Sequence, residues 1–283
     1  MFNRNYMDYH KDRFLDSSLM FYKDDCELVA ILPASIHGTE LRSHGGLTYG
    51  GIICGESMKQ HIMNECFDAL LVYAKENSIS SIVYKVIPYI LTKYPCEEEL
   101  YTLWRHGAQL IRRDVSSTID LTCPFKMPKG RKAQIARAKR EGVAIEIEEN
   151  FDEFIALENQ VLSTYHQVKA VHTGAELALL NSRFPENIKL YTARKDGELL
   201  AGTLIFIYDN AIHTQYMASS ELGREIGALD LTIATIMHDY QTTKRYLDFG
   251  ISTEQEGLVF NDGLAAQKEG FGGRTIVYDI YRL

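Results

Sequence analysis

Short runs rich in apolar residues, each bounded by turn residues, predict three strands in the second half of the chain: 188–197, 198–210 and 211–220. Asp-Gly and Asp-Asn pairs separate these runs, and such pairs favour tight turns between strands. Apolar residues then recur at helical spacing over 228–244, which predicts a helix. The remaining pattern predicts a strand, a short helix and a final strand: 245–252, 263–273 and 274–283.

The first half repeats this order of elements at a spacing of about 165 residues. A strand, a pair of strands, a helix, a strand, a helix and a strand are predicted there, in chain order, at 27–35, 40–55, 58–78, 80–88, 96–107 and 108–121. Each half therefore has the order strand, strand, strand, helix, strand, helix, strand. Two further helical segments, 150–167 and 174–184, precede the strands of the second half.

The composition is that of a soluble globular protein with a core of ordinary size. Hydrophobic residues make up 46% and charged residues 24% of the 283 positions, and this length suits two modest domains. Neither half alternates strand and helix after a glycine-rich first turn, which argues against a dinucleotide-binding fold. We therefore predict two related α+β domains, 1–123 and 143–283, joined by a basic linker helix at 124–142.

Charge and cysteine content exclude several classes of protein. The net charge of −8 gives no overall field that attracts nucleic acid, and we expect the cations of 124–142 to form a solvated helix face. The 5 cysteines form no CxxC pair, which argues against a disulfide framework or a metal site and favours a reducing cytoplasm. The polar N-terminus is unlike a signal peptide, and no apolar run approaches the ~18 residues of a membrane span. We expect a cytoplasmic protein without a metal or a membrane span.

Three segments carry a resemblance to a known family: "GRKAQIARAKREGV", "YLDFGIS" and "GLAAQKEGFGG". Together with the order of elements they resemble the GNAT acyltransferase superfamily, and two such units in one chain resemble its FemABX-like branch. The resemblance implies an α+β fold of two tandem GNAT-like (acyl-CoA N-acyltransferase) domains, each a mixed central sheet flanked by helices. In FemABX enzymes a lysine just ahead of a glycine-phenylalanine pair contributes to acyl transfer, and Lys268 matches that lysine.

Lys268 and Asp248 are the candidate catalytic residues of the second half. Lys268 is either a cation that caps the negative end of its helix or a buried charge that stabilises the oxyanion of acyl transfer. Leu103 stands at the corresponding place in the first half, so this type of helix does not require a lysine there. Asp248, in an otherwise apolar strand, either pairs with a buried partner or orients an acceptor amine. Asn261 and Asp262 are expected to be N-caps of the helix that contains Lys268.

The segment "SHGGLTYGGI" supplies the candidates of the first half, His44 and Tyr49, as acid–base groups. We expect a hairpin turn at Gly45-Gly46. At Gly50-Gly51 we expect a strand that opens toward a cleft, because paired glycines weaken a strand and mark a close backbone approach. For His44, a surface position beside a turn is the alternative.

Segment 217–231 lies where GNAT enzymes bind the pyrophosphate of coenzyme A on backbone N–H groups at the start of a helix. The resemblance assigns cofactor binding to these residues: Met217, Ala218, Ser219, Arg224, Gly227 and Ala228. Leu229 departs from the usual signature, and Glu221 and Glu225 would repel a pyrophosphate. A polar loop that leads into a capped helix is the alternative.

The resemblance predicts an N-acyltransferase with acyl-CoA as the default donor and an amine of a small molecule, peptide or sugar as the acceptor. No Cys–His pair presents itself, so we expect catalysis by positioning and oxyanion stabilisation without a covalent intermediate. A FemABX-type peptidyltransferase that uses aminoacyl-tRNA is the alternative enzyme, and we expect no other nucleic-acid partner. A non-catalytic binding module on the same scaffold is the rival from a different class.

Overall fold

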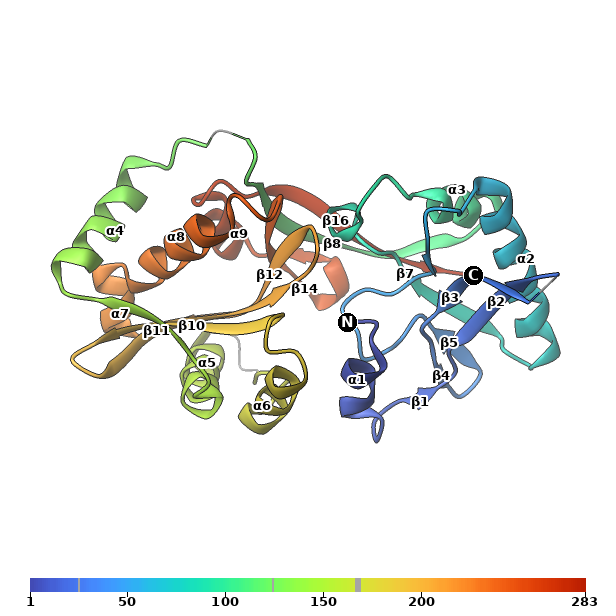
Figure 1. Ribbon diagram of the computed structural model, residues 1–283, viewed down its shortest axis with the longest axis horizontal. Helices are drawn as coiled ribbons and strands as arrows, with labels where there is room; N and C mark the ends of the chain where they lie inside the picture. Colours follow the sequence, from blue (N-terminus) through green and yellow to red (C-terminus); the bar gives the residue numbers. More distant parts are fainter. Residues whose placement is uncertain (25, 124, 166–168) are drawn as a thin grey trace. The chain divides into compact units, whose positions relative to one another are not determined.

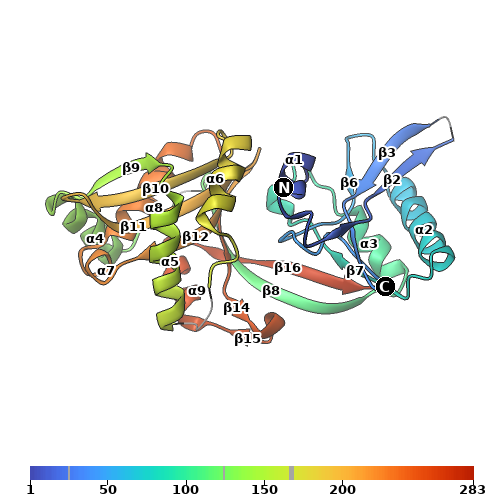
Figure 2. The ribbon, with the colours of Figure 1, turned by 90° about the horizontal axis from the view of Figure 1, so that it is seen from below.

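The computed structural model describes residues 1–283 except 25, 124 and 166–168, and it divides the chain into two compact units. Unit 1 contains residues 1–115, 253–259 and 277–283, and unit 2 contains residues 116–252 and 260–276. Two long strands, β8 (Gln109–Asp120) and β16 (Arg274–Arg282), contribute residues to both units (Figures 1 and 2). The units are described separately below.

Unit 1 is built on a mixed sheet whose strands lie in the order β1, β4, β5, β7, β16. The strands of this sheet, apart from β16, are β1 (Leu15–Asp16), β4 (Ser35–His37), β5 (Glu40–Arg42) and β7 (Ser81–Lys85). β5 runs parallel to β7, and β16 runs antiparallel to β7 with Tyr281 opposite Tyr84. A separate antiparallel sheet contains β2 (Leu19–Lys23), β3 (Glu27–Leu32) and β6 (Ile53–Cys54).

The core of unit 1 forms where helix α2 (Gln60–Glu76) packs on these strands. Four of the five buried residues of α2 are spaced three or four apart and so form one apolar stripe: Met63, Phe67, Leu70 and Ala74. They meet Leu32, Leu41 and Ile82 from the strands in one hydrophobic cluster. The unit also contains the short helices α1 (Arg4–Met7) and α3 (Glu98–Arg105).

Unit 2 contains a larger mixed sheet in the order β8, β13, β12, β11, β10, β9. Its strands, apart from β8, are β13 (Tyr246–Ile251), β12 (Ala211–Ser219), β11 (Glu198–Ile207), β10 (Ile188–Lys195) and β9 (Ala144–Glu148). Neighbouring strands are antiparallel except β12 and β13, which are parallel. All residues of β11 except Glu198 are buried, because the strand is paired on both edges and covered on both faces.

Helices cover both faces of the unit 2 sheet (Figure 1). One face carries α5 (Phe151–Tyr165) and α6 (Gly174–Arg183), which begins with a capping box between Thr173 and Glu176. The other face carries α4 (Lys129–Arg140), α7 (Glu221–Ile226), α8 (Ala228–Tyr240) and α9 (Asp262–Glu269). The apolar side of α8 packs on β11 and β12 in the main core of the unit.

The predicted fold class is confirmed, with mixed sheets flanked by helices and the predicted order of elements in both halves. After its strands the first half continues with α2, β7, α3 and β8, and the second continues with α8, β13, α9 and β16. The pattern missed β1, β2, β4, β9, α1, α7 and two short strands within 253–260. The boundaries 1–123, 124–142 and 143–283 follow chain order and stay a prediction. Residue 124 of the predicted linker and residues 166–167 of the predicted helix lie outside the described part.

One feature of the fold could not be deduced from the pattern. The last strand of each half extends into the other unit: residues 116–120 of β8 pair with β13, and residues 280–282 of β16 pair with β7. A short ladder of β14 (Thr253–Glu254) and β15 (Val259–Phe260) follows β13. Among the described helices, none is both long enough and apolar enough to cross a membrane.

Candidate functional site

The sheet of unit 2 opens between its two parallel strands. β12 and β13 are paired at only three positions: Ala211 with Tyr246, Ile212 with Leu247, and His213 with Asp248. Beyond them β12 has an irregular register with β11 between Leu204 and Ile205, and the ladder with β13 ends. We call residues 213–216 and 248–252 the β12–β13 fork. Strand ends that separate in this way leave backbone groups available to a substrate.

Asp248 lies at the base of the fork and is fully buried. Its carboxylate accepts hydrogen bonds from Ser116 Oγ at 2.6 Å and from Thr118 Oγ1 at 2.8 Å, and it contacts Nδ1 of His213 at 2.7 Å. The structure therefore provides the buried partner that was one of the two expectations for Asp248. His213 was not singled out by the sequence, although a histidine within the apolar strand "AIHTQYM" was an available signal.

Lys268 is buried with 3% of its surface exposed, so it does not extend into solvent as an ordinary helix cap does. Its Nζ donates to the backbone oxygens of Gly250 at 2.9 Å and Ile251 at 2.6 Å, both in the fork. Burial lowers the pKa of Lys268 to about 8, against the opposing effect of the Asp248 charge. The ammonium group has three N–H donors, and these two bonds leave one for a substrate oxygen.

The glycines after Lys268 serve the packing around it. Gly272 has a φ of +99° and allows the ring of Phe125 to approach so closely that a Cβ on Gly272 would lie 2.8 Å from it. Asn261 caps α9 by accepting from the backbone N–H of Leu264, as predicted. Asp262 lies in the first turn of the same helix.

Two buried hydroxyl groups of the fork region lack a partner. Thr214 Oγ1, in β12, and Ser252 Oγ, directly after β13, have no hydrogen bond to any described residue. An unpaired buried hydroxyl costs about 1–3 kcal/mol, so native structures rarely retain one without a reason. In the fork they are polar groups that a bound substrate can satisfy.

A second polar cluster lies on the face of the sheet that carries α5. Glu158 is 6% exposed, and its Oε2 has no hydrogen-bond partner among the described residues. Burial raises the pKa of Glu158 to about 7, and its charge contributes to the raised pKa of Tyr216 in β12, of which burial is the main cause. The Tyr216 hydroxyl accepts from the backbone N–H groups of Val171 and His172, both at 3.2 Å, and contacts His172 Nδ1 at 2.8 Å.

Sequence reasoning missed Glu158, although a signal was present. The buried residues of α5 include Phe151, Phe154 and Ile155, so position 158 continues the same apolar stripe. A glutamate at a core position is rarely left without a partner or a function.

We predict that Glu158→Gln changes the pH dependence of stability. The carboxyl titrates near 4.5 in the unfolded chain and about 7 in the folded protein, so the folded state holds an extra proton between these values. The free energy of unfolding of the parent, relative to that of the variant, is therefore highest below pH 4.5 and decreases as the pH rises to 7. The expected decrease between pH 5 and 8 is about 1–3 kcal/mol. Urea denaturation at each pH measures it, with the exposed Glu149→Gln as control; a pH-independent difference would contradict the prediction.

The residues predicted to hold a pyrophosphate are already engaged by the protein. Met217, Ala218 and Ser219 end strand β12, and the following residues form helix α7 instead of an open loop. The N–H of Arg224 donates to Ser220 O at 2.9 Å, and the N–H of Gly227 donates to Gly223 O at 3.0 Å. These two donors are therefore not directed at a ligand.

Helix α4 covers the N-terminal end of α8. Gly227, with a φ of +82°, precedes α8, and a Cβ on it would lie 2.7 Å from the backbone oxygen of Gln134 in α4. Gly227 and Ala228 are buried. Asp230 in the first turn of α8 bonds to Arg131 at 2.8 Å, so the positive end of the helix dipole already has a carboxylate near it.

The outer side of α4 is strongly basic. Its exposed cations are Lys129, Lys132, Lys139 and Arg140. Unlike Arg131 and Arg137, they form no ion pair with the described residues. We call these four residues the α4 basic face.

The first-half candidates lie in unit 1 and are both buried. His44 is 3% exposed with a φ of +34°, and Tyr49 makes edge contacts with Phe2 and Tyr278. Burial, and after it the charge of nearby His10, lower the pKa of His44 to about 4. The imidazole is therefore neutral at pH 7 and has little capacity as a base there. His44 is not the surface residue that was the alternative.

The close backbone approach expected at Gly50 is present, but it is made to the protein itself. A Cβ on Gly50 would lie 2.4 Å from the backbone oxygen of Ser43. This segment is packed within unit 1 and does not border an open strand. Among the described residues there is no cluster of His, Cys, Asp and Glu suited to hold a metal ion.

Comparison with known proteins supports the resemblance found in the sequence. Residues 129–256 match the family described as the acetyltransferase (GNAT) domain, a range that contains the whole fork but not Lys268. No curated protein sequence is a significant match to the chain. Among solved structures, the crystal structure of FemX has a TM-score of 0.70 at 11% identity, and the similarity covers 97% of this chain and 90% of that chain.

Two further solved structures have similar folds. The C-terminal domain of a putative lysylphosphatidylglycerol synthetase from Agrobacterium fabrum has a TM-score of 0.61 at 13% identity, covering 99% of this chain and 90% of that one. The tandem GNAT protein from the clavulanic acid biosynthesis pathway has a TM-score of 0.53 at 12% identity, covering 99% and 87%. Residues 129–256 therefore match a GNAT domain, and the fold of the whole chain is similar to that of FemX and of the tandem GNAT protein.

Proposed function

We propose that the protein is an N-acyltransferase that works at the β12–β13 fork. In acyl transfer to an amine, negative charge develops on the carbonyl oxygen of the acyl group. The remaining N–H of Lys268 is placed to stabilise that oxygen, since the other two hold the ammonium group on Gly250 O and Ile251 O. Asp248 and His213 then act as positioning residues that fix the strands on either side.

We further propose that the donor is an ester of the aminoacyl-tRNA class. The observation that carries this proposal is the position of α4, which covers the N-terminal end of α8 and presents the α4 basic face to solvent. Because α4 covers the end of α8, little room is left for a coenzyme A pyrophosphate at its expected place. The α4 basic face suits a phosphate backbone, because exposed cations without an ion pair gain most from binding phosphates.

Acyl-CoA is the second candidate donor. Its support is the match of residues 129–256 to the acetyltransferase (GNAT) domain, a fold that typically binds acetyl-CoA. The engaged N–H groups of Arg224 and Gly227 are the observation against it. The acceptor in either case is proposed to be a primary amine.

Binding measurements distinguish the two donors. We expect fluorescently labelled tRNA to bind and to lose about 10²-fold in affinity between 50 and 200 mM salt, because about four phosphates are neutralised. Reversing three charges on the α4 basic face should abolish most of this binding: Lys132→Glu, Lys139→Glu and Arg140→Glu. The control carries the same charge change on exposed lysines of unit 1: Lys11→Glu, Lys23→Glu and Lys75→Glu.

Calorimetry with coenzyme A and acetyl-CoA completes the test. Stoichiometric binding of either one, with no tRNA binding, would make acyl-CoA the donor and overturn the tRNA proposal. Equal loss of tRNA affinity in both triple variants would also overturn it, since net charge alone would then explain the binding. Failure of both donors to bind would favour the non-catalytic module.

A further inference from the structure

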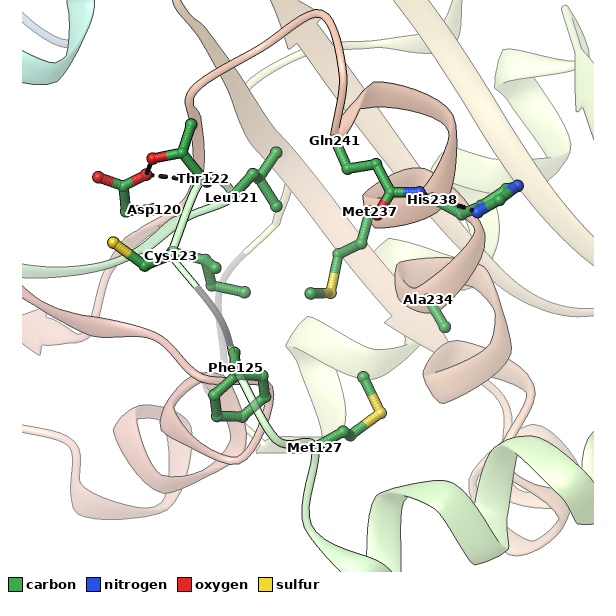
Figure 3. A pocket seen from close by; sticks show the side chains of 11 residues that line it. Asp120, Leu121, Thr122, Cys123, Phe125, Met127, Ala234, Met237, His238 and Gln241 are labelled. Atoms are coloured by element: carbon green, nitrogen blue, oxygen red, sulfur yellow. Dashed lines mark hydrogen bonds between the residues drawn. The ribbon is translucent and has the colours of Figure 1, made fainter.

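A pocket of about 430 Å³ lies in unit 2 between helix α8 and the chain that leads from β8 to α4 (Figure 3). Helix α8 lines it with Ala234, Met237 and His238, and the C-cap residue Gln241 continues the same side of the helix, because these residues are three or four positions apart. The pocket shares no lining residue with the β12–β13 fork. It also lies along the C-terminal half of α8, away from the end that GNAT enzymes use for a pyrophosphate.

Part of the pocket lining is apolar and adaptable. Leu121, Met127 and Met237 reach toward the open centre in Figure 3, and Phe125 closes one side. Methionine side chains are flexible and fit themselves to irregular apolar ligands. The volume lies within the range of pockets that hold small molecules, which is about 300–1,000 Å³.

A lysine beside the pocket, although not one of its lining residues, is available to an anion at the edge. Asp120 is the one carboxylate among the described lining residues, and it is engaged by Thr122 at 2.6 Å and Arg245 at 3.2 Å. Lys126 lies between the lining residues Phe125 and Met127, is exposed, and has no ion pair with a described residue. His238, also exposed, adds a hydrogen-bonding group on the α8 side.

We propose that this pocket binds a single aliphatic chain that ends in an anionic head, of the monoalkyl or monoacyl phosphate class. The chain occupies the space between Leu121, Met127 and Met237, and the head lies near Lys126. This site is separate from the fork, and the inference does not depend on acyl transfer or on the identity of the donor.

The probe is dodecyl phosphate below its micelle concentration, added to protein labelled with ¹³C at the methionine methyl groups. We expect the methyl resonances of Met127 and Met237 to shift on binding. Met20, which is 62% exposed and lies in unit 1, is the internal control and should not shift. Octyl, decyl and dodecyl phosphates should bind progressively more tightly, about tenfold or more for each pair of methylenes, because each added methylene is buried.

A pocket-filling variant and a matched control test the location. Ala234→Phe places a ring in the pocket and should weaken dodecyl phosphate binding at least tenfold. Ala178→Phe adds the same ring to an exposed helical position of α6 and should leave binding unchanged. If Ala234→Phe lowers the melting temperature strongly, Met237→Gln replaces it as the variant, with the same expected loss.

Further ligands and one variant distinguish the contribution of the aliphatic chain of the ligand from that of its anionic head. Inorganic phosphate and dodecyltrimethylammonium should leave both methionine resonances in place, and Lys126→Gln should weaken dodecyl phosphate several-fold. The proposal is overturned if dodecanol binds as tightly as dodecyl phosphate, if inorganic phosphate causes the same shifts, or if Ala234→Phe has no effect. The charge-reversed α4 triple variant should retain binding, because its substitutions do not include Lys126.

Discussion

Replacing Lys268 by methionine is expected to slow acyl transfer by about 10²–10³-fold, the usual effect of removing one group that stabilises an oxyanion. The variant also leaves the oxygens of Gly250 and Ile251 without their donor, which costs about 1–3 kcal/mol of stability. Single-turnover measurement of transfer from the donor established by the binding tests to a primary amine gives the rate. The pKa of about 8 predicts that the contribution of Lys268 declines as the pH rises past that value, since the ammonium group then loses its proton.

A second lysine provides a matched control. Lys244 Nζ also donates to two backbone oxygens in unit 2, those of Tyr208 at 2.6 Å and Asp209 at 3.2 Å, but it lies outside the fork. Lys244→Met should therefore lower stability to a comparable or smaller degree and leave the transfer rate unchanged. If the two variants transfer at the same rate as the parent, Lys268 is a structural residue that holds α9 on β13.

Removal of the Asp248 carboxylate should cause the largest loss of stability among the predicted variants. Asp248→Ala leaves His213 without its buried charge partner and also unpairs Ser116 and Thr118. A buried polar group left without its hydrogen-bond partner costs about 1–3 kcal/mol, and this substitution leaves three such groups. Asp248→Asn keeps one acceptor oxygen, so we expect a smaller loss of about 1–3 kcal/mol. Urea denaturation followed by circular dichroism measures both.

The comparison for Asp248 is an exposed aspartate of the same unit. Asp262 lies in the first turn of α9 and interacts with the helix dipole, so Asp262→Ala should cost less than about 1 kcal/mol. An Asp248→Ala variant that is no less stable than Asp262→Ala would contradict the prediction. It would mean that the buried hydroxyls and His213 find other partners at no cost.

The sequence indicated part of the candidate site because two residues conflict with their local surroundings. Asp248 is an acid in an apolar strand, and Lys268 is a cation in a helix of small residues, so both stood out from the pattern alone. His213 and Thr214 did not, because a single polar residue in a strand is unremarkable until its cross-strand neighbours are known. Asp248 and His213 are 35 positions apart in the chain and become partners only through the parallel pairing of β12 and β13.

The pyrophosphate segment shows the limit of a motif. The spacing of Arg224 and Gly227 predicted donors at the start of a helix, and these residues do lie there. Whether such donors face a ligand depends on what packs against them, and here α7 and α4 occupy that space. Local sequence specifies backbone conformation, but it does not specify which distant element covers it.

The order of strands and helices, the α+β class and the resemblance to tandem GNAT proteins could be predicted from the sequence, because apolar periodicity and turn residues act over a few neighbouring positions. The opening of β12 from β13, the burial of Lys268 and the pairing of the ends of β8 and β16 depend on contacts between distant parts of the chain. The apolar pattern of β16 is the same whether it pairs within its own half or with β7. Backbone hydrogen bonds between strands are the same for every residue type, so the sequence of a strand does not specify its partner strand. The packing of the whole chain selects that partner.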